Sequence, residues 1–291
     1  MRPHICSYDY QWPERFTEAT EPEERRFAAA ARRETGAVDR IERTTLNRVV
    51  QRLRQARYAI NERIADASGF QVEHLTAMRG QITTVLNEFA DTWNHEFLRT
   101  ADAVEDAATA LVTRPLGVLG FEIGAPMLPG QLMDVLVGFS ANKIKGLTAE
   151  AIDKVDTLLT LAISGGQSKT AFTNSLKDLL PSPAGAGSIA ARARRIIRTE
   201  INRIHSTVTH ARMTQASNTV KGLRKYWLSA GDLHVRPSHV RAGQSYGPDN
   251  AILVNQPFFV GGFKAMFPRD PALPAAEVVN CRCRNIPVPP A

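Results

Sequence analysis

The sequence predicts an α+β protein in which long helices precede a small C-terminal domain of one helix and short strands. Apolar residues recur at three- and four-residue steps through most of residues 21–114. A further amphipathic stretch follows Ser188, and after Gly222 the chain changes to short, turn-rich segments typical of β-strands. Helices followed by strands indicate an α+β architecture.

Residues 21–114 are predicted to form a long α-helical hairpin. Two apolar stripes run through the segment, the first closing near Gly69 and the second fading at Arg114 and Pro115. Each helix of about 40 residues would be on the order of 60 Å long. Their short connection implies an antiparallel pair, a shape typical of a spacer or an assembly surface. Residues 1–20 lack periodicity and are interpreted as an extended N-terminal arm.

Residues 115–184 are interpreted as an apolar connector followed by short helices. The stretch 115–135 is rich in glycine and proline yet apolar, so we expect it to pack against a neighbouring element or a partner chain. One short helix is expected to begin at Thr148, and Ser168 is expected to cap the next. Residues 181–187 have the composition of a linker.

Residues 185–291 are predicted to form the C-terminal α+β domain. Ser188 is expected to cap a helix that continues to about Asn218 with one apolar face. The β-like segments that follow it are residues 223–228, 252–254, 258–260 and 278–286.

The positive charge of the chain, +7 in total, is concentrated in this last domain. Residues 185–291 hold 15 Lys and Arg against 5 Asp and Glu, an excess of +10, which leaves −3 for the rest. We therefore expect sequence-independent binding of double-stranded DNA, with a basic domain that has no such partner as the alternative. The expected phosphate contacts lie on the solvated side of the helix, which also carries His205 and His210: Arg192, Arg194, Arg195, Arg198 and Arg203.

Tyr226 and Trp227 stand beside Arg224 and Lys225. Aromatic rings next to basic side chains can stack on nucleic acid bases. The commoner arrangement, which we favour, is a core strand whose basic neighbours face solvent.

Several classes of protein are disfavoured by composition and motif. No run of about 18 to 20 apolar residues predicts a membrane helix, and Met1 to Glu14 lack the apolar core of a secretory signal. Three cysteines are too few for a disulfide scaffold, which favours a reducing, aqueous compartment. No phosphate-binding glycine loop, G-x-S-x-G or H-E-x-x-H motif occurs. No cofactor is expected other than a structural zinc ion.

Glu200 falls in the middle of the apolar face of the last long helix, between Ile197 and Ile204. An unpaired buried carboxylate would cost several kcal/mol, so a cation or hydrogen-bond donors must meet it. Arg236 and His239 are the partners we favour. A general base in a cleft is the alternative interpretation of Glu200.

Cys281 and Cys283 flank Arg282 near the C-terminus. On a strand, both thiols would share one face, with Arg282 and Arg284 on the other. Two thiols on one face suit zinc, and either His234 or His239 could complete the site. Ordinary packing and a redox or disulfide role are the alternatives.

An ordered series of motifs extends across the second half of the chain. It comprises Arg198-Thr199-Glu200, the segment 222–232 with Trp227 and Asp232, Val235-Arg236-Pro-Ser-His239, Gly243-Gln244, Phe267–Pro271 and Asn280-Cys281-Arg282-Cys283-Arg284. Upstream, residues 142–180 contain Ser164-Gly-Gly-Gln-Ser168. Over about residues 140–288 this series resembles the C-terminal domain of the phage Mu protein F-like head morphogenesis family.

The resemblance implies a minor head protein of a tailed phage, a structural component rather than an enzyme. Such a protein would lie inside the head at the portal vertex of the virion, after assembly in the host cytoplasm. Its expected partners are the portal protein, the major capsid protein and packaged double-stranded DNA, which leaves open a role in DNA delivery. No catalytic residues are implied.

The alternative function is an enzyme of the C-terminal domain that acts on nucleotides or nucleic acid, similar to an ADP-ribosyltransferase. That class needs an E-x-E pair, and none occurs after Glu200.

Overall fold

The computed structural model describes residues 10, 12–14, 21–66, 72–126, 131–164, 168–179 and 188–290. Helices dominate the first two thirds of the chain, and a small antiparallel sheet follows them, so the predicted α+β class is confirmed. The expected helix end at Gly69, the linker 181–187 and most of the N-terminal arm lie outside the described residues.

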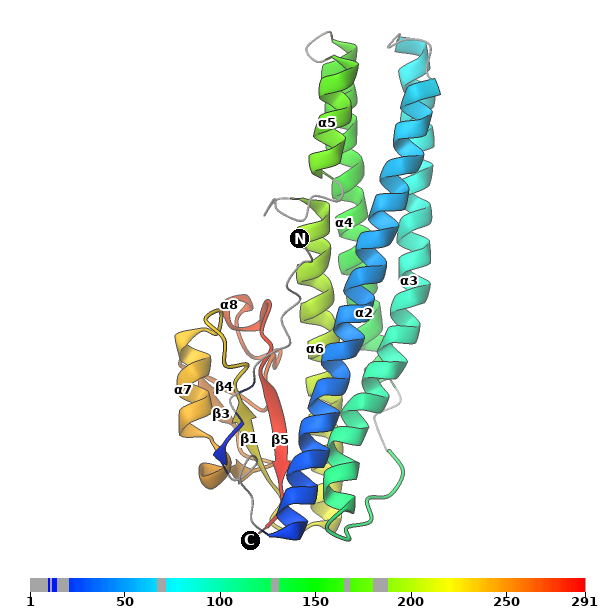
Figure 1. Ribbon diagram of the computed structural model, residues 1–291. Coiled ribbons are helices and arrows are strands. Elements are labelled where there is room, and N and C mark those ends of the chain that lie inside the picture. The colour runs from blue at the N-terminus through cyan, green and yellow to red at the C-terminus, as the bar shows by residue number, and fades with distance from the viewer. Residues whose placement is uncertain are drawn as a thin grey trace. The chain divides into compact units, whose positions relative to one another are not determined.

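The predicted hairpin helices are α2, Pro22–Asp66, and α3, Val72–Gly117, which run side by side (Figure 1). Glu23 and Glu24 in the first turn of α2 complement the positive end of the helix dipole. Helix α3 continues through Pro115. Proline so close to the C-terminal end removes one backbone donor without stopping the helix.

Helix α4, Leu132–Ile163, begins far upstream of the predicted start at Thr148. The Thr148 hydroxyl donates to the Ile144 carbonyl oxygen at 3.2 Å, the bond of a residue inside a helix rather than of a cap. The predicted apolar connector is therefore reduced mainly to a turn at 118–120 and the extended residues 121–126. Gly138 and Gly146 made the first half of α4 resemble a loop, but both are helical.

Two serine caps are confirmed. The Ala171 backbone N–H donates to Ser168 Oγ at 3.2 Å, at the start of α5, Lys169–Leu179. The Ala191 N–H donates to Ser188 Oγ at 3.1 Å, at the start of α6, Ile189–Thr219. Each hydroxyl satisfies a backbone donor that the first helical turn leaves without a carbonyl partner.

The C-terminal strands form two small sheets. Strands β2 (Ile252–Leu253), β1 (Arg224–Leu228) and β5 (Arg284–Val288) pair antiparallel in that order. Strand β3 (Phe258–Val260), which was predicted, forms a hairpin with β4 (Phe263–Ala265), a strand that the sequence did not predict. Gly261 and Gly262 make this turn with φ of 60° and 89°, values that favour glycine.

The expected strand at 278–286 is wrong in its first half. Helix α8, Ala275–Val278, ends there, and β5 begins only at Arg284, so the two C-terminal cysteines lie in the loop before the strand. Helix α7, Pro237–Ser245, and the 3-10 turn η1, Pro248–Asn250, complete the domain.

The chain divides into two compact units made of interleaved segments, not of consecutive ones. Unit 1 comprises 1–43, 100–134 and 198–291, and unit 2 comprises 44–99 and 135–197. The C-terminal strands therefore share a unit with the first part of α2, the end of α3 and most of α6.

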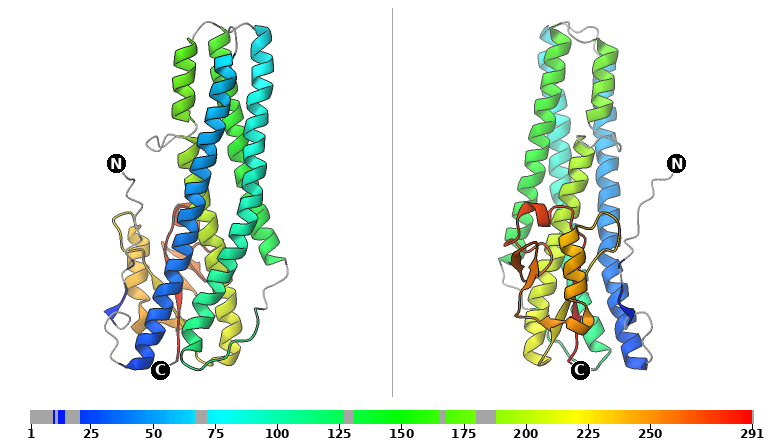
Figure 2. Two further views of the ribbon diagram at one scale, coloured as in Figure 1. Left: turned by 45° about the vertical axis from the view of Figure 1, so that its right-hand side comes forward. Right: turned by 90° about the vertical axis from the view of Figure 1, so that its left-hand side faces the viewer.

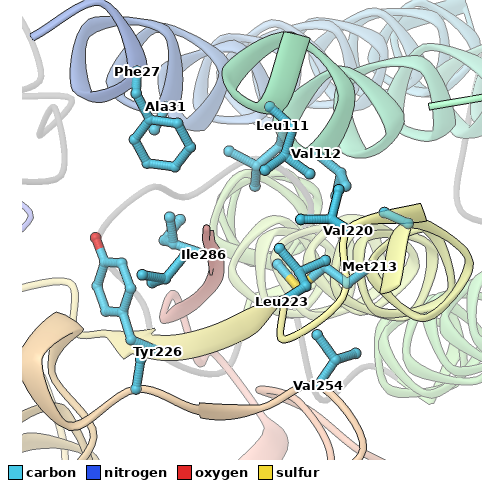
Figure 3. Close-up of a cluster of buried hydrophobic side chains, with 14 of the residues drawn as sticks. Phe27, Ala31, Leu111, Val112, Met213, Val220, Leu223, Tyr226, Val254 and Ile286 are labelled. Atoms are coloured by element: carbon cyan, nitrogen blue, oxygen red, sulfur yellow. The ribbon is translucent and has the colours of Figure 1, made fainter. Parts of the chain in front are cut away.

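The core of unit 1 joins these helices to the central sheet. Figure 3 shows Phe27 from α2 and Leu111 from α3 facing Ile286 from β5, with Met213 from α6 and Leu223 beside them. Both views of Figure 2 show the sheet and α7 beside the first part of α2 and the last part of α6. The sheet thus buries its apolar face against helices that are distant in sequence.

Unit 2 is a helical assembly with exposed apolar side chains. Its surface includes the ion pairs Arg79–Asp156 and Arg192–Glu150, each with an N–O distance of 2.6 Å. Its exposed large apolar side chains are Tyr58, Leu98, Val135, Phe139 and Leu161. No helix in the described part of the chain combines the length and apolar character that a membrane span requires.

Candidate metal centre

The structure brings together the three residues that the sequence suggested as zinc ligands. His239 lies on α7, and its Nδ1 is 3.5 Å from Cys281 Sγ and 3.4 Å from Cys283 Sγ. The three potential ligand atoms lie within 4.8 Å of one another, and all three residues are buried. The sequence offered His234 or His239 as the third ligand. His239 is the one that lies beside the cysteines, whereas His234 is exposed.

The other side of the His239 ring faces a carboxylate. Its Nε2 lies 2.9 Å from Glu277 Oε2, and the Ser238 hydroxyl donates to the same oxygen at 2.8 Å. The Trp227 ring packs edge-on against the imidazole, with centroids 5.3 Å apart. His239 therefore lies between a carboxylate near Nε2 and the thiols near Nδ1, with the Trp227 ring packed against its side.

Arg269 holds the cysteine loop from behind. Its guanidinium is fully buried and donates to the carbonyl oxygens of Cys281 and Cys283, both at 2.9 Å, and to that of Asn202 at 2.8 Å. Arg269 also donates to the Ser206 hydroxyl and to Cys281 Sγ, the latter at 3.5 Å. The φ of Arg269 is 69°, uncommon for a bulky residue, and these bonds hold it there.

The two thiols are not equivalent. Burial opposes ionisation of Cys281, but the hydrogen bond with Cys283 and the charges of Arg269 and His239 together lower the pKa of Cys281 well below its usual value. Burial and the neighbouring Cys281 raise the pKa of Cys283. Burial also lowers the pKa of Arg269. The two cysteines thus differ in the direction of their pKa shifts, and the guanidinium of Arg269 favours ionisation of Cys281.

Other motif residues anchor the loops around the cluster. Arg282 forms an ion pair with Asp232, which also accepts the His234 backbone N–H at 2.9 Å. Arg236 donates to the Val279 carbonyl oxygen at 2.5 Å. The backbone N–H of Asn280 donates to Thr199 Oγ1 at 3.1 Å, which ties the loop to α6.

Glu200 is buried as predicted, but its expected partners are wrong. Arg203, one turn further along α6, donates to the Glu200 carboxylate. Arg236 and His239 are engaged with Val279 and with the cysteine cluster. The partner was missed because an i,i+3 neighbour on the same helix can also turn inward when another element covers that side.

The basic side of α6 is less open than the sequence suggested. Three of its five arginines pair with carboxylates: Arg192 with Glu150, Arg198 with Glu42 and Arg203 with Glu200.

The expectation that His205 faces solvent is wrong, because its side chain is buried and burial lowers its pKa well below the usual value. Trp227 and Tyr226 are also buried, as a core strand requires, rather than displayed for stacking on bases. Arg224 faces solvent as expected, but the expectation is wrong for Lys225, which is buried and donates to the Met266 carbonyl oxygen at 2.6 Å.

Residues 188–290 therefore form a long helix with a small antiparallel sheet, closed by a C-x-C loop. Residues 153–286, slightly less than half of the chain, match the family described as phage Mu protein F like protein. This similarity broadly supports a phage head protein.

A relative of another kind shares part of the sequence. Over 97 residues the chain is 33% identical to the NAD(+)--arginine ADP-ribosyltransferase EFV of Enterococcus faecalis, a match that covers 33% of this chain and 19% of that protein. The chain thus spans about a fifth of the length of this relative. No solved structure matches the chain.

Proposed function

We propose that the protein is a minor head protein that acts in head assembly at the portal vertex, inside the capsid. The family match over residues 153–286 carries this proposal. The expected protein partners are the portal protein and the major capsid protein.

The exposed apolar side chains of unit 2 support a role in protein contacts. Val135 and Phe139 lie one turn apart on α4 and are 65% and 45% exposed. Apolar side chains on neighbouring turns share one helix face, and such exposed faces mark interaction sites. We assign this face to the portal protein.

Incorporation into heads tests the assignment. Heads are purified from the encoding phage with the wild-type gene, with Val135→Glu/Phe139→Glu, or with the control Asn142→Glu/Lys145→Glu at exposed positions of the same helix. Cryo-electron microscopy should place the wild-type protein at the portal vertex, and only the first double variant should be lost from heads. Wild-type protein absent from heads, or distributed over the capsid shell, contradicts the portal proposal.

Sequence-independent DNA contact is the second part of the proposal, supported by the +10 excess after Gly185. Because three arginines of α6 are paired with carboxylates, the contact is assigned to exposed cations elsewhere: Lys221, Arg224, Arg241 and Lys264. Fluorescence anisotropy with two unrelated duplexes should give equal affinities that fall linearly on a log–log plot against salt.

Charge removal should change the salt dependence in a defined way. The slope of log affinity against log salt concentration measures the number of phosphate contacts. Neutralising two of the exposed cations, Lys221→Gln/Arg224→Gln, should lower the magnitude of this slope by up to about two, whereas Arg198→Gln should leave it unchanged. No binding by the full chain near about 50 mM salt would assign the basic surface to a protein partner.

An ADP-ribosyltransferase activity is the second candidate, favoured by the match to the Enterococcus faecalis protein. Glu200 is the candidate base, and its burial beside Arg203 favours a structural role. Incubation with labelled NAD and an arginine acceptor should give no transfer. Transfer that Glu200→Gln abolishes, in a variant that remains folded, would favour the enzyme.

A further inference from the structure

We propose that His239, Cys281 and Cys283 bind one zinc ion, with a small exogenous molecule as the fourth ligand. The inference goes beyond head assembly and concerns a metal site within the family-matched region. It rests on the geometry of three buried side chains from α7 and the loop before β5.

The distances fit a tetrahedral zinc site. Zinc binds thiolate sulfur at about 2.3 Å and imidazole nitrogen at about 2.0–2.1 Å, which sets the S–N edge of a tetrahedron at about 3.6 Å. The two Nδ1–Sγ distances are 3.5 and 3.4 Å. Both S–N separations therefore match the edges of a zinc tetrahedron, and all three atoms lie within 4.8 Å of one another.

The support of the imidazole is the arrangement found at metal-binding histidines. Such a histidine usually directs its second ring nitrogen at a carboxylate, which fixes the tautomer and leaves the ligating nitrogen unprotonated. Glu277 Oε2 lies 2.9 Å from Nε2 of His239, close enough for this contact although not aligned as a hydrogen bond, and the Ser238 hydroxyl donates to the same oxygen. The other ring nitrogen, Nδ1, faces both sulfurs.

The surroundings keep the site closed and its ligands fixed. The cysteines pack in a cluster with Trp227, Phe258 and Val260, so solvent is excluded on that side. Arg269 holds both cysteine carbonyl oxygens, which fixes the direction of the thiols. A buried apolar shell and backbone hydrogen bonds to the ligand loop are typical of a structural metal site.

The ligand set favours zinc over hard cations. Two thiolates and one imidazole are soft or borderline donors, which exclude magnesium and calcium and suit zinc or copper(I). Among the described residues, no fourth Cys, His, Asp or Glu joins the three. A water molecule or another small ligand would complete a tetrahedron.

A metal-free arrangement is the rival, in which the Cys281 thiolate is held only by Arg269 and by hydrogen bonds. It accounts for the buried guanidinium, and hydrogen bonds between the sulfurs and Nδ1 would also orient His239. The two alternatives differ in metal content, which can be measured on the purified full-length protein.

Elemental analysis of the full chain should find one equivalent of zinc, and replacement by cobalt(II) should give the sulfur-to-metal charge-transfer bands of a tetrahedral thiolate site. Cys281→Ser and Cys283→Ser should lose both signals. Cys6→Ser is the matched control and should keep them; Cys6 lies outside the described residues. If the ligand variants fail to fold, Glu277→Gln retains all three ligands and should weaken zinc binding about 10- to 100-fold.

Three results would overturn the proposal. The first is a folded, metal-free protein that shows no charge-transfer bands with cobalt(II). The second is zinc that survives in the folded serine variants, and the third is zinc that is lost in Cys6→Ser. Copper(I) in place of zinc, measured by the same elemental analysis, would refute the assignment of the metal.

Discussion

Arg284 and Asp39 form an ion pair between strand β5 and helix α2, with 2.8 Å between Nη2 and Oδ1 and 245 positions between them in sequence. The arginine is fully buried, and the Tyr10 hydroxyl donates to the same carboxylate oxygen at 3.1 Å. Burial raises the pKa of Asp39 despite the lowering effect of Arg284. The pair thus joins the last strand to the first long helix within unit 1.

Removal of one partner of this pair should destabilise the fold strongly. Arg284→Met should lower the free energy of unfolding by about 3–5 kcal/mol, because Asp39 is left buried without its cation. The double variant Asp39→Leu/Arg284→Met should lose less than either single variant, since no unpaired charge remains. Urea unfolding measures all three. Additive losses would mean that the charges do not interact.

Glu200→Ala should also lower stability, although the carboxylate pairs with a neighbour on its own helix. The change removes the ion pair with Arg203, most of whose side chain is buried, and we expect Tm to fall by roughly 5 °C or more. The control Asp91→Ala removes an exposed carboxylate of α3 and should change Tm little. A Tm within about one degree of wild type would contradict a stabilising pair at Glu200.

A fragment of residues 185–291 should not fold on its own. Its helix α6 and its sheet bury apolar side chains against Phe27 and Ala31 of α2 and Leu111 and Val112 of α3. Without these helices the fragment exposes that core and loses the Asp39–Arg284 pair. Circular dichroism and urea unfolding should show no cooperative transition, whereas the full chain should show one. A cooperative transition in the fragment would make residues 185–291 an independent domain.

His210 should make stability fall with acid. Burial and the nearby charge of Lys225 on β1 lower its pKa from 6.5 to about 4, so between these values the unfolded chain binds a proton that the folded chain does not. Stability is therefore lost as pH falls from about 6.5 to 4, by up to about 3 kcal/mol.

Two variants test the contribution of His210. His210→Phe keeps a ring against Phe267, with which the imidazole now packs at 5.1 Å between centroids, and His210→Gln does not. In both variants the free energy of unfolding, measured with urea at several pH values, should fall less between pH 6.5 and about 4 than in the wild type. Curves parallel to wild type would show that His210 does not carry this dependence.

Features that depend on near neighbours in sequence were predicted well. The hairpin helices follow from three- and four-residue periodicity, and the Ser168 and Ser188 caps need only a hydroxyl and a backbone N–H three residues on. Cys281 and Cys283 both meet His239, although they lie in the loop before β5 and not on the strand that the sequence predicted.

Helix α4 begins before the predicted start at Thr148 because contacts with distant segments outweigh the local helix preference. Gly138 and Gly146 weaken local helix propensity, and packing in unit 2 overrides that preference.

Partners distant in the chain were decided only by the tertiary structure. Periodicity placed Glu200 on a buried face but could not reveal that its cation is Arg203, nor that His239 rather than His234 meets the cysteines. The basic side of α6 looked solvated because sequence shows a charge without showing what covers it, and Glu42 lies more than 150 positions from Arg198. Such pairs depend on how segments far apart in the chain meet, which local patterns do not encode.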